Sequence, residues 1–183
     1  MTVPTTELTT ERLLLRQWRD DDLDALAALD ADPEVMRWIG DGSVRDRAQT
    51  QATLDIFRAH WADLGYGLFA AEENGRLVGW VGLAVPNFLP EILPAVEIGW
   101  RLARDSWGRG LATEGARAVL EFAFDDLGLD RVVSVCHVEN TASERVMLRL
   151  GMHKDRDTVA PTSGVPVHVY AIDRAGYESR GPR

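Results

Sequence analysis

Two glycines separated by one residue lie immediately before a helical sequence pattern. Gly108 and Gly110 carry no side chains, so backbone N–H groups in this turn can approach an anion closely. The start of the following helix adds unpaired N–H donors and the positive end of a helix dipole. Arg109, between the glycines, adds a full positive charge. The segment could therefore bind a pyrophosphate group, although an ordinary turn from strand to helix has the same spacing.

The surrounding residues differ from the common nucleotide-binding and metal-binding patterns. A third glycine is absent, and so is the Gly-Lys-Ser/Thr ending of a P-loop. The single cysteine, Cys136, cannot form an internal disulfide, and its apolar neighbours indicate a buried, inert thiol. The histidines show no HExxH pattern and no close pair: His60, His137, His153 and His168. We therefore expect no metal site.

The glycine turn joins a predicted strand to a predicted helix. Apolar residues recur at spacings of three and four from Ala116 to Leu127, which indicates an amphipathic helix. The strand before the turn is predicted over residues 95–102. A second buried strand is predicted over 131–138, followed by a helix over 140–150. The turn is therefore expected to lie inside the first of two consecutive β-α units.

The N-terminal half supplies the remaining elements. Asn74-Gly75 predicts a tight hairpin, because both residues tolerate the positive φ angles that such a turn requires. Ser43 and Asp46 resemble a capping box at the start of a helix that ends near Gly65. The complete predicted order is β α α β β β α β α β β, which indicates an α/β chain with a mixed sheet.

Length and charge restrict the class of protein. The chain has 183 residues, with 20 Lys or Arg and 29 Asp or Glu, a formal charge of −9. This length suits a single domain over residues 1–183, and 45% hydrophobic residues supply its core. The acidic balance disfavours nucleic acid and anionic membranes as partners. No run approaches the about 18 apolar residues of a membrane span, and the first ten residues lack the pattern of a signal peptide, so we expect a cytoplasmic protein.

Several segments, in order along the chain, resemble the GNAT N-acetyltransferase superfamily. Residues 97–102 (EIGWRL) and 106–114 (SWGRGLATE) are similar to its acyl-CoA-binding core, and residues 140–152 are similar to its next conserved segment. Residues 10–16 and 32–36 resemble the branch of ribosomal-protein N-terminal alanine acetyltransferases. Each segment alone is common, but the ordered set spans nearly the whole chain and favours a cofactor-binding role for the glycine turn.

The resemblance implies a GNAT-like α/β fold, classed as α+β in some schemes. Its mixed, largely antiparallel sheet is flanked by helices, and two central strands splay apart in a V. The pantetheine arm of acetyl-CoA would enter the V, the pyrophosphate would lie on the glycine turn, and Asn140 would face the pantetheine amide or the thioester. The implied cofactor-binding residues are Trp100, Arg101, Leu102, Trp107, Gly108, Arg109, Gly110, Leu111, Ala112, Thr113 and Asn140.

The implied reaction transfers an acetyl group from a thioester to an amine, so a base must first remove a proton from the ammonium form. Glu97 is the candidate base, directly or through water, and a solvated or ion-paired strand residue is the alternative interpretation. Glu114 lies in the first turn of a helix, where it is suited to stabilise the dipole. Many superfamily members carry a proton-donating tyrosine where this chain has Met147. Ser143 is the nearest hydroxyl, either as a catalytic proton donor or as a helix cap.

The acceptor is less constrained. Trp38 and His137 are candidates to line its pocket, with packing as the alternative. We expect an acetyl-CoA-dependent N-acetyltransferase of a protein N-terminal α-amine, whose pKa of about 7.7–8.0 leaves more of it unprotonated than an alkyl amine. A small-molecule amine, such as an aminoglycoside, a polyamine or an amino-acid derivative, is the second hypothesis. A non-catalytic acyl-CoA-binding module is the third, and a homodimer stays open.

Overall fold

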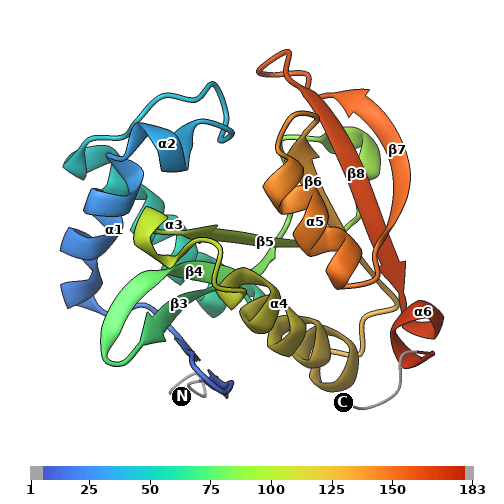
Figure 1. Ribbon diagram of the computed structural model, residues 1–183, viewed down its shortest axis with the longest axis horizontal. Helices are drawn as coiled ribbons and strands as arrows, with labels where there is room; N and C mark the ends of the chain where they lie inside the picture. The colour runs from blue at the N-terminus through green and yellow to red at the C-terminus, as the bar shows by residue number, and fades with distance from the viewer. Residues whose placement is uncertain (1–5, 180–183) are drawn as a thin grey trace.

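The computed structural model describes residues 6–179, which form one mixed sheet with helices on both faces (Figure 1). The strand order is β1-β2-β3-β4-β5-β6-β8-β7, and only the β5–β6 pair among these neighbours is parallel. The strands are β1 (Leu8–Thr9), β2 (Leu14–Arg16), β3 (Leu68–Glu73), β4 (Arg76–Ala84), β5 (Glu97–Leu102), β6 (Arg131–His137), β7 (His153–Val159) and β8 (Pro166–Asp173). The predicted mixed, largely antiparallel sheet is confirmed.

The helices surround the sheet in the predicted order, with two short helices added, one over Pro33–Met36 and one at the C-terminal end. They are α1 (Leu23–Asp30), α2 (Pro33–Met36), α3 (Arg47–Leu64), α4 (Leu111–Glu121), α5 (Thr141–Arg149) and α6 (Arg174–Glu178). A π-helical turn over Phe122–Asp126 extends α4. No helix of the described residues is long and apolar enough to cross a membrane.

Local sequence signals explain most of these boundaries. Asn74 and Gly75 adopt φ angles of 52° and 78° and join β3 to β4, as predicted. The capping-box prediction at Ser43 was wrong in register. Asp46 is the cap of α3 and exchanges hydrogen bonds with Gln49, three residues further on. The physical reason is that the Gln49 side-chain oxygen can accept a hydrogen bond from the Asp46 N–H, which completes a capping box at this pair.

Two apolar clusters attach helices to opposite faces of the sheet. Leu26 of α1 belongs to a cluster with Trp80, whereas Ala116 of α4 belongs to the main core with Val81. Trp80 and Val81 are consecutive on β4, so their side chains point to opposite faces. The sheet is therefore covered on one face by α1 and on the other by α4.

The sheet divides between β5 and β6. Their parallel ladder contains one residue pair, Glu97 with Val133, where the Val133 N–H donates to the Val96 carbonyl at 2.9 Å. In contrast, the whole of β5 pairs with β4, and the whole of β6 pairs with β8. Beyond Glu97 the two central strands therefore separate, as the expected V requires (Figure 1).

Candidate functional site

A cleft of about 530 Å³ opens where β5 and β6 separate. Its walls come from the end of β5, the glycine turn, α5 and the segment around α2. Most residues expected to hold the cofactor or the acceptor meet here. Those lining the cleft are Trp38, Trp100, Arg101, Leu102, Trp107, Gly108, Gly110, Leu111, Ala112, Thr113, Asn140 and Ser143.

The glycine turn has the geometry of an anion cradle. Gly108 and Gly110 adopt φ angles of 70° and 80°, and Gly110 is the N-cap of α4. No side chain of the described residues caps this helix start, so its first N–H groups are available to a ligand. The Thr113 hydroxyl is buried in the same helical turn without a hydrogen-bond partner among the described residues. These donors fit a phosphorylated ligand.

The charge of the cleft supports the same fit. Its lining holds four arginines and one glutamate, although the whole chain has a charge of −9. One of the four, Arg101, is already paired with the buried Asp30 at 2.6 Å, so its charge is balanced inside the protein. Arg145 and Arg149 lie one helical turn apart on α5, and the sequence analysis did not select them. The spacing of four residues between the two arginines was the available signal, because residues at i and i+4 share one helix face.

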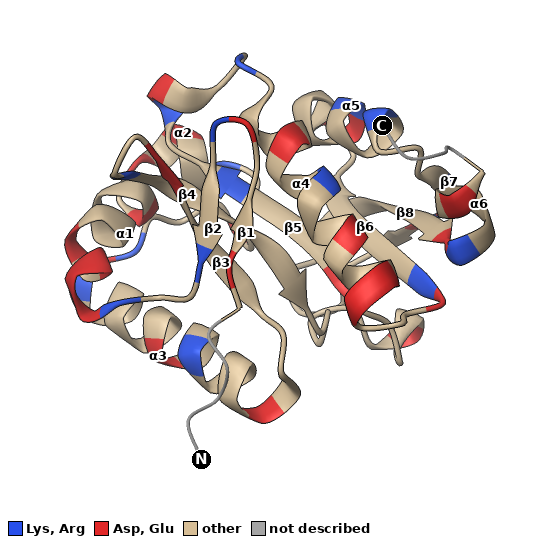
Figure 2. Ribbon diagram, turned by 90° about the horizontal axis from the view of Figure 1, so that it is seen from below, with Lys and Arg blue, Asp and Glu red and all other residues tan. Residues whose placement is uncertain are grey.

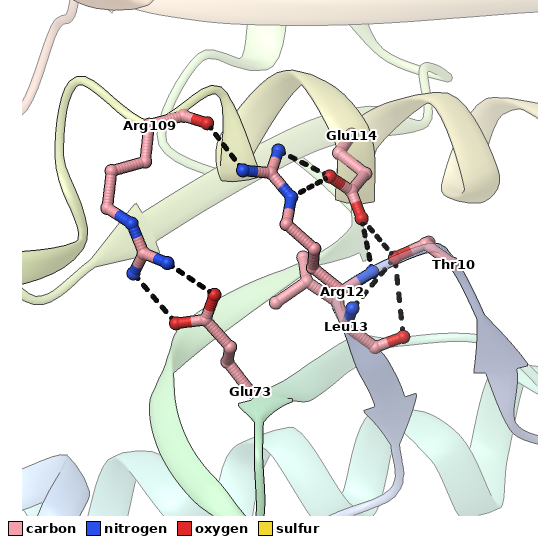
Figure 3. A network of polar contacts seen from close by, with 6 residues as sticks. All are labelled: Thr10, Arg12, Leu13, Glu73, Arg109 and Glu114. Atoms are coloured by element: carbon pink, nitrogen blue, oxygen red, sulfur yellow. Dashed lines mark hydrogen bonds and ion pairs between the residues drawn. The ribbon is translucent and has the colours of Figure 1, made fainter.

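Arg109 is oriented differently from its neighbours. Both of its terminal nitrogens contact the Glu73 carboxylate, at 2.6 and 2.7 Å, and its side chain does not belong to the cleft lining (Figure 3). These hydrogen bonds raise the pKa of Arg109 and lower that of Glu73. Its carbonyl accepts a hydrogen bond from Arg12 at 2.9 Å. Arg109 therefore joins the turn to β3.

Glu114 occupies the first turn of α4 and anchors the N-terminal segment (Figure 3). Its carboxylate accepts hydrogen bonds from the Thr10 hydroxyl at 2.6 Å and from the Arg12 backbone and guanidinium at 2.8 and 2.7 Å. Burial works against ionisation, but these hydrogen bonds lower the pKa of Glu114. Acidic residues also lie where the chain enters α1 and in the π-helical turn that follows α4 (Figure 2). Glu114 is therefore a structural carboxylate.

The start of α5 presents an amide and a hydroxyl to the cleft. The Asn140 side-chain oxygen accepts the Ser143 N–H at 3.2 Å, so Asn140 is the cap of this helix. The Ser143 side chain is thereby left outside the capping role and lines the cleft. Met147 is buried one turn further on.

Glu97 lies at the closed end of the V. It pairs with Ala84 of β4 and Val133 of β6, and its side chain is half-buried just outside the cleft lining. Burial raises the pKa of Glu97 to about 8, although a hydrogen bond from the Val135 backbone lowers it. The described residues place no cation within ion-pair distance of Glu97, which contradicts the ion-paired interpretation.

An aromatic contact bridges the two halves of the sheet near the cleft. Trp38, which follows α2, packs on His137 at the end of β6 with ring centroids 4.7 Å apart. The Arg37 guanidinium lies 4.6 Å from the Trp38 ring centroid. Trp38 lines the cleft, whereas His137 lies outside the lining and supports the tryptophan.

The comparison with protein families decides what kind of site this is. The family model of the acetyltransferase (GNAT) domain matches residues 12–153. The chain belongs to the GNAT acetyltransferase family. Members of this family are acetyltransferases that use acetyl-CoA, so this GNAT protein is an acetyltransferase and acetyl-CoA is its cosubstrate.

Individual relatives agree with this assignment. The chain is 33% identical to the uncharacterized protein YkkB of Bacillus subtilis over 81% of this chain and 86% of the relative. It is 35% identical to the FsC-acetyl coenzyme A-N(2)-transacetylase of Aspergillus fumigatus over 68% of this chain and 55% of the relative. An acetyltransferase structure from Agrobacterium tumefaciens is 29% identical, with a TM-score of 0.76, and covers 93% of this chain and 95% of its own.

Proposed function

We propose that this GNAT protein transfers the acetyl group of acetyl-CoA to a protein N-terminal α-amine, with Glu97 as the general base. The observation that carries the proposal is a carboxylate without a cationic partner at the closed end of a basic cleft. A group in this position can accept a proton beside the bound thioester.

The cleft offers separate contacts to each part of the cosubstrate. The glycine turn, the first N–H groups of α4 and the Thr113 hydroxyl would hold the pyrophosphate. Arg145 and Arg149 add positive charge from α5. The backbone of residues 100–102 has lost β6 as a neighbour and would pair with the pantetheine arm. Acetyl-CoA, when bound, supplies the acetyl group as a reactive thioester.

Proton transfer is the task of the protein side chains. An ammonium group has no free electron pair, so it must be deprotonated before it attacks a carbonyl carbon. The pKa of Glu97, about 8, is close to the about 7.7–8.0 of an α-amine, so the two groups can exchange a proton at little cost. Ser143 is the candidate hydroxyl to hold a proton for the leaving sulfur, since Met147 cannot donate one.

The α-amine acceptor is supported by this match of pKa values and by the resemblance of residues 10–16 and 32–36 to N-terminal acetyltransferases. A small amine is the second candidate, because the relative from Aspergillus fumigatus is named as an N(2)-transacetylase without reference to a protein acceptor.

Thiol release from acetyl-CoA tests both candidates. Peptides with free N-termini, the same peptides with blocked N-termini, and a panel of small amines are supplied in parallel. We expect release with free peptide N-termini alone. Release with small amines alone would support the second candidate, and silence with retained CoA binding would indicate a binding module.

A further inference from the structure

Two side chains replace the next rung of the ladder where β5 and β6 separate. After the Glu97–Val133 pair, a continued parallel ladder would bring the Val135 N–H to the Ile98 carbonyl. In the structure the Ser134 hydroxyl donates a hydrogen bond to the Ile98 carbonyl instead, with an oxygen–oxygen distance of 2.8 Å. The Val135 backbone hydrogen bonds to the Glu97 carboxylate. The two backbone groups that would have bonded to each other, the Ile98 carbonyl and the Val135 N–H, are therefore each hydrogen-bonded to a side chain.

The Ser134 hydrogen bond is shielded from water. Ser134 is 2% exposed, and Ile98 is fully buried in the main core. A buried carbonyl that loses its donor is costly, so the Ile98 oxygen requires either Ser134 or the backbone of β6. If Ser134 is the donor, the β5–β6 ladder ends at Glu97. If the Val135 N–H is the donor, the ladder continues by one more hydrogen bond.

We propose that Ser134 is a positioning residue, which stops the β5–β6 ladder at Glu97 and leaves the Val135 N–H free to orient the Glu97 carboxylate. The inference rests on the proposed function of Glu97 as the base. The point at which β5 and β6 separate would then have two roles. It admits the cosubstrate, and it holds the Glu97 carboxylate in place.

The surroundings of Glu97 make this hydrogen bond its main polar contact. Ala84 of β4 lies opposite Glu97, and Val133 and Val135 occupy the same face of β6. Arg131 and His137 stand at the two ends of that face: the Arg131 guanidinium is paired with Asp155 at 2.6 Å, and the His137 ring packs on Trp38. Within residues 6–179 no charged side chain contributes to the shift of the Glu97 pKa.

The variant Ser134→Ala removes the hydroxyl and tests the proposal. We expect the Val135 N–H to turn to the Ile98 carbonyl, so that a scalar coupling across this hydrogen bond becomes detectable by NMR. The Glu97 carboxylate then loses a donor, and its pKa, followed by the carboxyl carbon shift, rises further. The rate at neutral pH falls about ten-fold, as for the loss of a hydrogen bond to a charged group, and the rising, acid-side limb of the pH–rate profile moves to higher pH. The dissociation constant of CoA changes less than about two-fold, because the glycine turn is untouched.

Ser163→Ala is the matched control, since Ser163 lies in the exposed loop between β7 and β8. It should leave the titration of Glu97 and the rate unchanged. An unaltered Glu97 titration in Ser134→Ala overturns the proposal, whatever happens to the rate. The proposed function fails separately, if Glu97→Gln keeps full activity, because the carboxyl titration in Ser134→Ala does not depend on turnover.

Discussion

Two carboxylates on either side of the glycine turn have opposite surroundings. Glu114, after the turn, accepts hydrogen bonds from Thr10 and Arg12, and its pKa is lowered (Figure 3). Glu97, before the turn, lies among aliphatic residues, and its pKa is raised to about 8. The side chains have the same chemistry, so the difference arises from the burial of each carboxylate and from its hydrogen-bonding partners.

This comparison separates a structural carboxylate from a candidate base. A carboxylate with a guanidinium partner stays ionised at neutral pH and has little tendency to take a proton. A desolvated carboxylate without such a partner exchanges its proton near neutral pH, as general base catalysis requires. We therefore expect substitution by glutamine to affect the rate at Glu97 and the stability at Glu114.

The largest effect is expected on catalysis by Glu97→Gln. Loss of a general base lowers the rate about 100-fold or more, and the activity of the wild-type protein should rise with pH through about 8. The pH profile is measured at saturating acceptor, so that the free α-amine does not dominate it. A variant that retains the same rise of activity with pH would show that another group is the base.

The second effect concerns stability and also belongs to Glu97. The folded chain holds this proton up to a pKa of about 8, whereas the unfolded chain releases it near the ordinary value of 4.5. Ionisation in the folded state is therefore costly, and the free energy of unfolding falls as pH rises between these values, by at most about 1.4 kcal/mol per pH unit. Denaturant unfolding of the wild type and Glu97→Gln at pH 5 and pH 8 measures this slope. Parallel curves would contradict it.

The third prediction concerns Glu114→Gln, for which the pH dependence of stability has the opposite sign. A lowered pKa stabilises the folded state above the ordinary value, and this contribution is lost as pH falls through the folded pKa. Arg12 is 38% exposed, so screening limits the loss on substitution to about 1–2 kcal/mol at pH 7. Chemical denaturation gives this value, and the shape of the pH–rate profile should be that of the wild type. A displaced rising limb in that profile would place Glu114 in the chemistry.

The smallest effects compare two neighbours in the glycine turn. Gly110→Ala introduces a side chain at a φ of 80° and disturbs the first N–H groups of α4, so CoA binding weakens about five-fold. Arg109→Ala removes a guanidinium already paired with Glu73, and changes the CoA affinity less than about two-fold. Calorimetric titration of both variants measures the difference. Equal losses would mean that Arg109 leaves Glu73 to reach the cosubstrate.

Much of the fold follows from local signals in the sequence. The hairpin at Asn74-Gly75 and the amphipathic α4 depend on residues within a few positions of one another. The two-residue strand β1 was missed, because it exists only through its pairing with Leu14 and Leu15. Helix α6 was missed as well, since its five residues are capped by Asp173 at the end of β8.

The candidate site was less accessible to sequence reasoning. Gly108 and Gly110 were found by their spacing, and the other cofactor-binding residues by resemblance to the GNAT superfamily. Arg145 and Arg149 were recognised only when α5 was placed beside the cleft. The role of Ser134 had no sequence signal, because its acceptor, the Ile98 carbonyl, is 36 positions away in the chain.

By itself, the sequence determined the glycine turn, the helix that follows it and the order of the longer elements, because each depends on contacts between residues close in the chain. It also placed Glu97 on a strand beside that turn. Only the tertiary structure decided which carboxylate meets a cation. Arg12 reaches Glu114 from 102 positions away, and no such cation approaches Glu97 among the described residues. The physical reason is that ionisation depends on solvent and charge in three dimensions, which the folded chain alone arranges.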